Sequence, residues 1–273
     1  MSQSSPPAGR SDYAAAAHAP HPPLEGYYAH PDERPAFLRD LFDGAAGYYD
    51  RICAVGSLGS GRWYRGWVLQ RAGLRPGMKL LDVATGTGVV ARAAAELLES
   101  PACVVGVDPS IGMLREARRT VTGALTQGRI ETLPFRDGVF DVVTIGYALR
   151  HAADLEVAFR ECFRVLAPAG RLVILEISRP PAAALRTALR LYFTRVLPLL
   201  TREPQARLLM RYYWETIDAC VPAEKIMEIL ARTGFTGIER KAGERSRPNT
   251  SRRSRRADDG GRWRRATPGC RAS

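Results

Sequence analysis

The sequence predicts an α/β fold with a doubly wound, mostly parallel sheet. Short apolar runs alternate with amphipathic helical segments along much of the chain. A glycine-rich turn follows the first of these runs, and an aspartate ends the second. The chain has 273 residues, 45% of them hydrophobic, which is enough for one large domain with a substantial core. Strands that alternate with helices pair in parallel, so we expect helices on both faces of the sheet.

The predicted elements follow in a regular order. The strands are "KLLDVAT" (79–85), "ACVVGVD" (102–108), a weaker "ALTQGRI" (124–130), "FDVVTIGYAL" (140–149), "RLVILEISR" (171–179) and a short "TGIERK" (236–241). The intervening helices are predicted over 88–99, 109–120 and 154–170, the last ending in a Pro-Ala-Gly turn, and a further helix over 222–235. Residues 35–71 have a helical, aromatic pattern that precedes the first strand.

The predicted domain spans residues 35–241 and carries an amphipathic helical insertion over 181–218. Residues 1–34 are rich in Pro, Ala, Ser and His and are predicted to be a disordered tail. Residues 242–273 form a second predicted disordered tail. This tail has ten arginines against three acidic residues, so it holds +7 of the chain's +12 net charge and leaves the rest only mildly basic. No alternating apolar run follows "TGIERK", so we expect an incomplete C-terminal hairpin.

Several functional classes are disfavoured by composition. The five cysteines contain no C-x-x-C pair, which argues against a zinc site or disulfide framework, and no metal is expected. No stretch approaches about 18 uninterrupted apolar residues, so no membrane span is predicted. A cytoplasmic location is expected, with peripheral membrane contact left open. The sequence does not determine the oligomeric state.

The turn "DVATGTG" predicts a nucleotide site. Gly86 and Gly88 allow a ligand to lie against the backbone, where a Cβ would collide. Asp82 ends the preceding strand; a carboxylate there would repel a pyrophosphate and attract an ammonium, which favours S-adenosylmethionine over NAD. Asp108 ends the second strand, where its carboxylate can accept both ribose hydroxyls of either cofactor. An ordinary tight βα turn is the alternative interpretation of the glycines.

Four consecutive motifs make the chain resemble the class I S-adenosylmethionine-dependent methyltransferases: "DVATGTG", "VVGVDPSIGML", "ETLPFRDGVFDVVT" and "FRVLAPAGRLVILEIS". Within that class, the chain resembles the ubiquinone/menaquinone biosynthesis C-methyltransferases. "RVLAPAGRLVILEIS" is similar to that family's R-V-L-K-P-G-G…E-x-S signature, with Ala167 and Ala169 replacing Lys and Gly. In the degraded N-terminal motif "YYDRICAVGSLGSGRWYRGW", Cys53 replaces Asn and Gly61 stands where the family has His.

The resemblance implies S-adenosylmethionine as cofactor, with contacts in the glycine turn and at the ends of the later strands. Arg129 departs from the family's usual Asp or Asn, but the Ile130 backbone can still pair with the adenine edge. Met113 can pack against adenine or belong to the core. The full set of predicted cofactor residues is Asp82, Ala84, Gly86, Thr87, Gly88, Asp108, Met113, Arg129, Ile130 and Gly146.

Arg150 and His151 are the predicted catalytic residues, because they follow the fourth strand at the carboxyl edge of the sheet. The resemblance implies that Arg150 and its neighbour position or activate a water; His151 stands where the family has Asn and could take a proton itself. Tyr49 matches the family's Tyr-Asp motif and is expected to cover the cofactor. Packing roles are the alternative for His151 and Tyr49, and for Glu176 at the end of the fifth strand.

The predicted activity is C-methylation of a quinol or hydroxyquinone-type ring. The insertion's apolar stripe (Leu189, Phe193, Leu197 and Leu200) could cover a lipid-tailed quinol or another flat aromatic acceptor. An O- or N-methyltransferase of secondary metabolism is an alternative. A nucleic-acid-binding or RNA-modifying protein that uses the arginine tail is less favoured, because no base-binding motif follows the fourth strand, and no specific nucleic-acid partner is expected.

Overall fold

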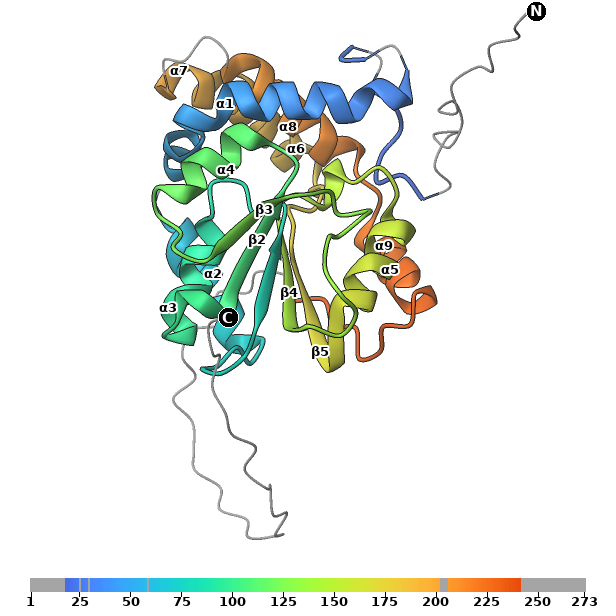
Figure 1. Cartoon of the computed structure of the whole chain (residues 1–273). Coiled ribbons are helices and arrows are strands. Elements are labelled where there is room, and N and C mark those ends of the chain that lie inside the picture. Colours follow the sequence, from blue (N-terminus) through green and yellow to red (C-terminus); the bar gives the residue numbers. More distant parts are fainter. Residues whose placement is uncertain (1–17, 25, 29, 58, 202–205, 242–273) are drawn as a thin grey trace, which may run out of the picture.

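The centre of the molecule is a five-stranded parallel sheet with the strand order β3-β2-β1-β4-β5. The computed structural model describes residues 18–24, 26–28, 30–57, 59–201 and 206–241. The strands are β1 (Leu80–Val83), β2 (Val104–Asp108), β3 (Ala124–Gln127), β4 (Phe140–Gly146) and β5 (Leu166–Leu175). The predicted doubly wound parallel sheet is confirmed (Figure 1).

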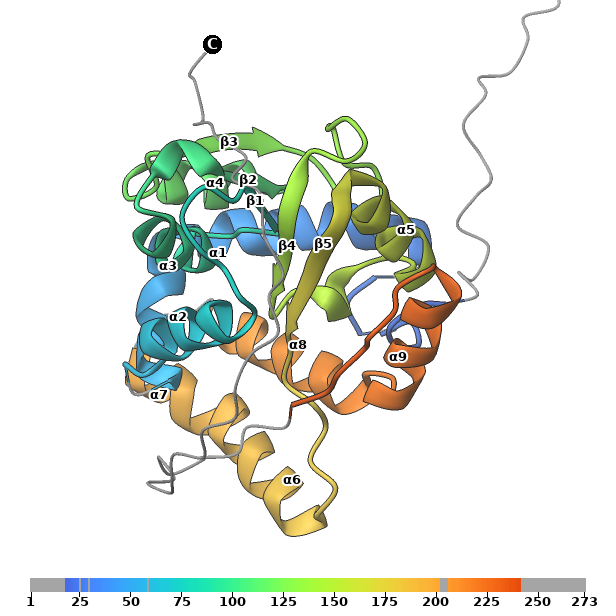
Figure 2. The same ribbon diagram turned by 90° about the horizontal axis from the view of Figure 1, so that it is seen from below.

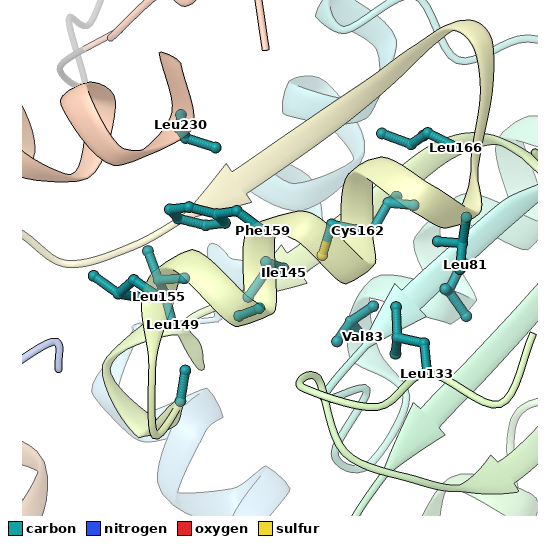
Figure 3. Packing of buried hydrophobic residues seen from close by; sticks show 14 of the residues in the cluster. Leu81, Val83, Leu133, Ile145, Leu149, Leu155, Phe159, Cys162, Leu166 and Leu230 are labelled. Atoms are coloured by element: carbon teal, nitrogen blue, oxygen red, sulfur yellow. The ribbon is translucent and has the colours of Figure 1, made fainter. Parts of the chain in front are cut away.

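Helices cover both faces of this sheet. On one face lie α5 (Leu155–Val165) and α9 (Ala223–Arg232), and on the other lie α2 (Gly61–Arg71), α3 (Val89–Leu98) and α4 (Ile111–Arg118), as Figures 1 and 2 show. Successive strand residues point to opposite faces, so Leu81 packs with α5 and α9 while Leu80 packs with α2 and α3. Figure 3 shows the first of these clusters, in which Phe159 of α5 lies near Ile145 of β4 and Leu230 of α9.

A helical layer crosses the carboxyl ends of the strands. It contains α1 (Arg34–Gly56), the short η1 (Pro31–Glu33), and the predicted insertion. The insertion consists of α6 (Ala183–Leu191), the π-helical turn η4 (Tyr192–Val196), α7 (Leu197–Thr201) and α8 (Ala206–Ala219). In Figure 1, α1 runs above the sheet, and it packs against α7 and α8. No helix in the described ranges is both long and apolar enough to span a bilayer.

The C-terminal part of the sheet differs from the prediction. Residues 236–241, predicted as a sixth strand, have no strand conformation, so β5 is an edge of the sheet in the described part of the chain. A strand of this kind needs a neighbour to satisfy its backbone groups, and "TGIERK" is followed by no described partner. The helix predicted over 154–170 also ends earlier, at Val165. The Pro-Ala-Gly segment belongs to β5 and contains its irregularity, where Ala169 has a φ of +64°.

The segment 18–34 also differs from the prediction of a disordered tail, because its described residues pack against the domain. The backbone N–H of Leu155 donates to the carbonyl oxygen of His18 at 3.0 Å, and that of Val221 donates to Pro20 at 2.8 Å. His21 and Tyr28 are buried. Polar composition hid this segment from sequence interpretation, because the backbone contacts that tie it to the domain are made with residues more than a hundred positions away. The rest of that tail, 1–17, and the arginine tail 242–273 lie outside the described residues.

Candidate active site

Two adjoining cavities, of about 490 and about 270 Å³, lie at the carboxyl edge of the sheet. Both are lined by Tyr49, Ala84, Gly86, Gly146, Tyr147 and Tyr213. The larger cavity also contacts the predicted cofactor residues Asp108, Met113, Arg129 and Ile130, and the smaller one contacts Asp82 and Thr87. Of the ten predicted cofactor residues, nine therefore line one continuous region, and Gly88 is the exception.

The glycine turn shapes the junction of the cavities. Gly86 has a φ of +56°, and a Cβ added to it would meet no atom within 4 Å, so it would project into the open cavity. Gly88 has a φ of +82°, and a Cβ there would lie 2.4 Å from Val121 Cγ2. The two glycines therefore have different roles: Gly86 leaves room beside the backbone, and Gly88 allows α3 to pack closely against Val121.

Two carboxylates stand at opposite ends of this turn. Asp108 accepts the backbone N–H groups of Gly86 and Ser110, each at 2.8 Å. Asp82 accepts the hydroxyls of Thr85 at 2.6 Å and Thr144 at 2.7 Å. Burial raises the pKa of each aspartate to about 6, against the opposing effect of these hydrogen bonds. Both carboxyls are mostly ionised at neutral pH. A bound cation or hydroxyl donor lowers the free-energy cost of keeping each buried carboxylate charged.

Helix α1 is tied over the turn by two acidic side chains. Asp43 accepts the Ser110 hydroxyl at 2.5 Å and the Gly112 N–H at 2.7 Å. Asp50 accepts the hydroxyl of Thr87. These contacts hold α1 against α4 and the glycine turn, and Tyr49 and Phe42 of α1 line the larger cavity.

The far end of the larger cavity is lined by Met113, Arg129 and Ile130. Met113 is almost fully buried and also lines the cavity, so this residue can both pack in the core and contact a ligand. The Arg129 guanidinium lies 3.2 Å from the Glu131 carboxylate, whose other oxygen accepts the Ala153 N–H at 2.7 Å. Glu131 thus compensates the positive charge of Arg129.

Arg150 lies behind the cavity wall. Its side chain is fully buried and lines neither cavity. Nη1 donates to Glu176 at 2.6 Å and to the Tyr147 carbonyl oxygen at 2.7 Å, Nε donates to the Thr216 hydroxyl at 3.2 Å, and the guanidinium lies 4.5 Å from the Tyr213 ring centre. Arg150 and Glu176 therefore join the turn after β4 to the end of β5 and to α8.

His151 does line the larger cavity. Its ring stacks on Tyr212, with centroids 5.6 Å apart, and its Nδ1 lies 3.5 Å from the Tyr212 hydroxyl. Burial, with the cations of Arg150 and Arg34 nearby, holds the pKa of His151 well below its usual value. The imidazole is neutral at physiological pH. Tyr49 and Tyr213, whose hydroxyls are hydrogen-bonded to each other, stand between the two cavities.

Comparison with known proteins places this geometry in a family. The model of the ubiE/COQ5 methyltransferase family matches residues 30–243. A demethylmenaquinone methyltransferase of Mycolicibacterium paratuberculosis is 38% identical over 213 residues, which cover 76% of this chain and 89% of that protein. The chain belongs to the ubiE/COQ5 methyltransferase family. It is an S-adenosylmethionine-dependent methyltransferase.

Other comparisons agree with this membership. The ubiquinone/menaquinone biosynthesis C-methyltransferase UbiE of Serratia proteamaculans is 33% identical over 218 residues, covering 76% of this chain and 86% of that protein. A solved SAM-dependent methyltransferase of Thermotoga maritima superposes with a TM-score of 0.52 at 19% identity, covering 72% of this chain and 81% of that one. This last likeness concerns the fold.

The two cavities fit the methyl donor. The open space beside Gly86 is what a ligand lying on the backbone requires. Asp108, the predicted acceptor of ribose hydroxyls, lines the larger cavity, and Asp82, the predicted partner of the methionine ammonium, lines the smaller one. These assignments of single residues remain predictions, as do the catalytic roles of Tyr49, Arg150 and His151.

Sequence interpretation missed several residues of the site. Asp50 follows Tyr49 directly in the family's Tyr-Asp motif, so a signal for it was present. Tyr213 and Phe42 were hidden in helices whose pattern indicates only an amphipathic surface. Arg34 and His21 carried no signal, because they occupy the segment that composition assigns to a tail.

Proposed function

We propose that this methyltransferase methylates a ring carbon of a quinol-type aromatic acceptor. The observation that carries the proposal is the aromatic wall beside the turn, formed by Phe42, Tyr49, Tyr147 and Tyr213. These rings present flat apolar surfaces to a flat acceptor. The names of the relatives, which are a demethylmenaquinone methyltransferase and a quinone biosynthesis C-methyltransferase, support the same acceptor class.

S-adenosylmethionine supplies an electrophilic methyl group. The protein then has to hold the acceptor carbon in line with this methyl, at about 3 Å, and to exclude water. Tyr49 and Tyr213 stand where the cavities meet, and burial raises the pKa of both phenols well above the ordinary value. They therefore stay protonated and neutral, and they serve as a cover and a positioning surface.

Carbon methylation requires an electron-rich ring, which the acceptor gains when a phenolic proton leaves. The ring carbon forms its bond to the methyl group as the methyl–sulfur bond breaks, with S-adenosylhomocysteine as the leaving group. That carbon's own proton then passes to water. His151 is neutral and can accept a hydrogen bond from the phenol. Because Arg150 and Arg34 disfavour an imidazolium, we propose that His151 orients the hydroxyl and that the proton passes to solvent.

The test is a methylation assay with labelled cofactor against a panel of quinols and phenols, with the methyl position determined by NMR. We expect transfer to a quinol ring carbon. A methyl found on oxygen or nitrogen would instead support the alternative of O- or N-methylation.

The role of His151 is tested by His151→Asn, with the exposed His30→Asn as the matched control. If the ring only hydrogen-bonds, turnover should fall less than about tenfold in His151→Asn. A collapse in turnover with unchanged cofactor affinity would show that His151 is a required base.

A further inference from the structure

Arg34, the first residue of α1, is a buried cation in the wall of the larger cavity. Arg34 lines that cavity and is only 7% exposed. No carboxylate among the described residues lies within ion-pair distance of it, and its Nε has no hydrogen-bond partner among them. A buried guanidinium without a counter-ion is costly, because burial removes its water without replacing the lost solvation.

The groups that hold Arg34 in place are all neutral. Nη2 donates to the Arg150 carbonyl oxygen at 2.9 Å and lies 2.9 Å from His21 Nε2. His21 Nδ1 is 2.7 Å from the Pro22 carbonyl oxygen, which can only accept, so Nδ1 carries the proton and Nε2 accepts from Arg34. Burial lowers the pKa of His21 to about 4. The Tyr212 hydroxyl beside Arg34 is also uncharged, since burial raises its pKa to about 12.

Neither of the two acidic residues that line the same cavity, Asp108 and Glu131, pairs with Arg34. Asp108 accepts two backbone N–H groups, and Glu131 pairs with Arg129 and accepts the Ala153 N–H. The exposed Arg39 adds a second positive charge to the wall. The part of the cavity beside Arg34 therefore has an uncompensated positive charge, and this charge is held rigidly by His21 and by the Arg150 backbone.

We propose that Arg34 binds an anionic oxygen, a phenolate or a carboxylate, on the aromatic acceptor. This rests on the proposed function, since it concerns the acceptor of that same site. Arg34 provides the missing counter-charge, so the acceptor binds preferentially as its anion. His151, which lines the same cavity, adds a neutral hydrogen-bonding group. An acceptor bound as a phenolate is the electron-rich form that carbon methylation requires.

Two naphthoquinones of nearly equal shape test the charge preference. 2-Hydroxy-1,4-naphthoquinone is an anion at neutral pH, and 2-methoxy-1,4-naphthoquinone is its neutral analogue. Their affinities are measured by calorimetry on the full chain with S-adenosylhomocysteine present. We expect the native protein to bind the anion at least about tenfold more tightly, as a charge-assisted hydrogen bond provides. Equal affinity for the two probes overturns the proposal, whatever the variants do.

Arg34→Met should abolish the preference, and Arg34→Lys should retain much of it. The control Arg136→Met, at an exposed arginine that lines neither cavity, should change it less than about threefold. S-adenosylhomocysteine affinity reports whether each variant keeps a folded cofactor site. A preference that survives in folded Arg34→Met, or that is lost equally in Arg136→Met, overturns the proposal. Failure of the proposed function gives another result: the anionic probe still binds through Arg34, but no quinol receives a methyl group in the methylation assay.

Discussion

The predicted cofactor side and the proposed acceptor side of the site are built in different ways. On the cofactor side, Asp82, Gly86 and Asp108 come from two adjacent strands and the turn after the first of them, and Asp108 is held by backbone N–H groups within 22 residues of it. On the acceptor side, Arg34 and Arg150 are joined across 116 residues, and Tyr49 and Tyr213 across 164. The first side depends on local backbone geometry, and the second on the docking of α1, α8 and the segment before α1.

The largest expected effect is on the acceptor side. Arg150→Ala leaves Glu176 buried without its partner and should destabilise the fold by about 3–5 kcal/mol in urea unfolding. Arg160→Ala, which breaks an exposed pair with Glu156, is the control and should cost less than about 1 kcal/mol. Equal losses in the two variants would mean that Arg150 does not hold the acceptor wall together.

The next largest effect belongs to the cofactor side. Asp108→Ala removes the predicted ribose contact and should cost about 2–3 kcal/mol of S-adenosylmethionine affinity, measured by calorimetry. The exposed Asp137→Ala is the control and should leave that affinity unchanged. Unchanged affinity in Asp108→Ala would remove the assignment of this carboxylate to the cofactor.

A pH titration of cofactor affinity tests the charge on the cofactor side. The raised pKa of Asp82, about 6, means that this carboxyl becomes protonated as pH falls below 6 and loses its attraction for an ammonium. Protonation of Asp82 should therefore lower cofactor affinity by up to about tenfold between pH 6 and pH 5. Asp82→Asn should bind more weakly at pH 7.5 and show a flatter pH profile. An identical profile in the variant would contradict this role.

The smallest effect compares two glycines with similar backbone angles. Gly86 and Gly138 have φ values of +56° and +67°, and at neither position would an added Cβ have an atom within 4 Å. Substitution by Ala should cost each about 1 kcal/mol of folding stability. Only Gly86→Ala should also weaken cofactor binding, by about 1–3 kcal/mol, because only this Cβ would occupy the cavity. Equal affinities in the two variants would show that the space beside Gly86 is not used.

Much of the cofactor side could be predicted from the sequence. The strand, turn and helix around Gly86 follow one another within 19 residues, from Leu80 to Leu98, so local pattern determines their geometry. The position of Asp108 at the end of β2 follows from strand length alone, and parallel pairing then brings it beside Gly86. Where prediction failed, at residues 236–241, the local pattern was adequate for a strand, but the described part of the chain offers no neighbouring strand to pair with it.

The sequence by itself determined the α/β class, the turn that carries Gly86, and the two carboxylates at the ends of β1 and β2. Each of these depends on residues close together in the chain. Only the tertiary structure decided that His21 and Arg34 belong to the domain, that Arg150 stands behind the wall, and that Tyr213 meets Tyr49. The physical reason is that burial and charge compensation arise from contacts between distant segments, and no local pattern encodes which segments meet.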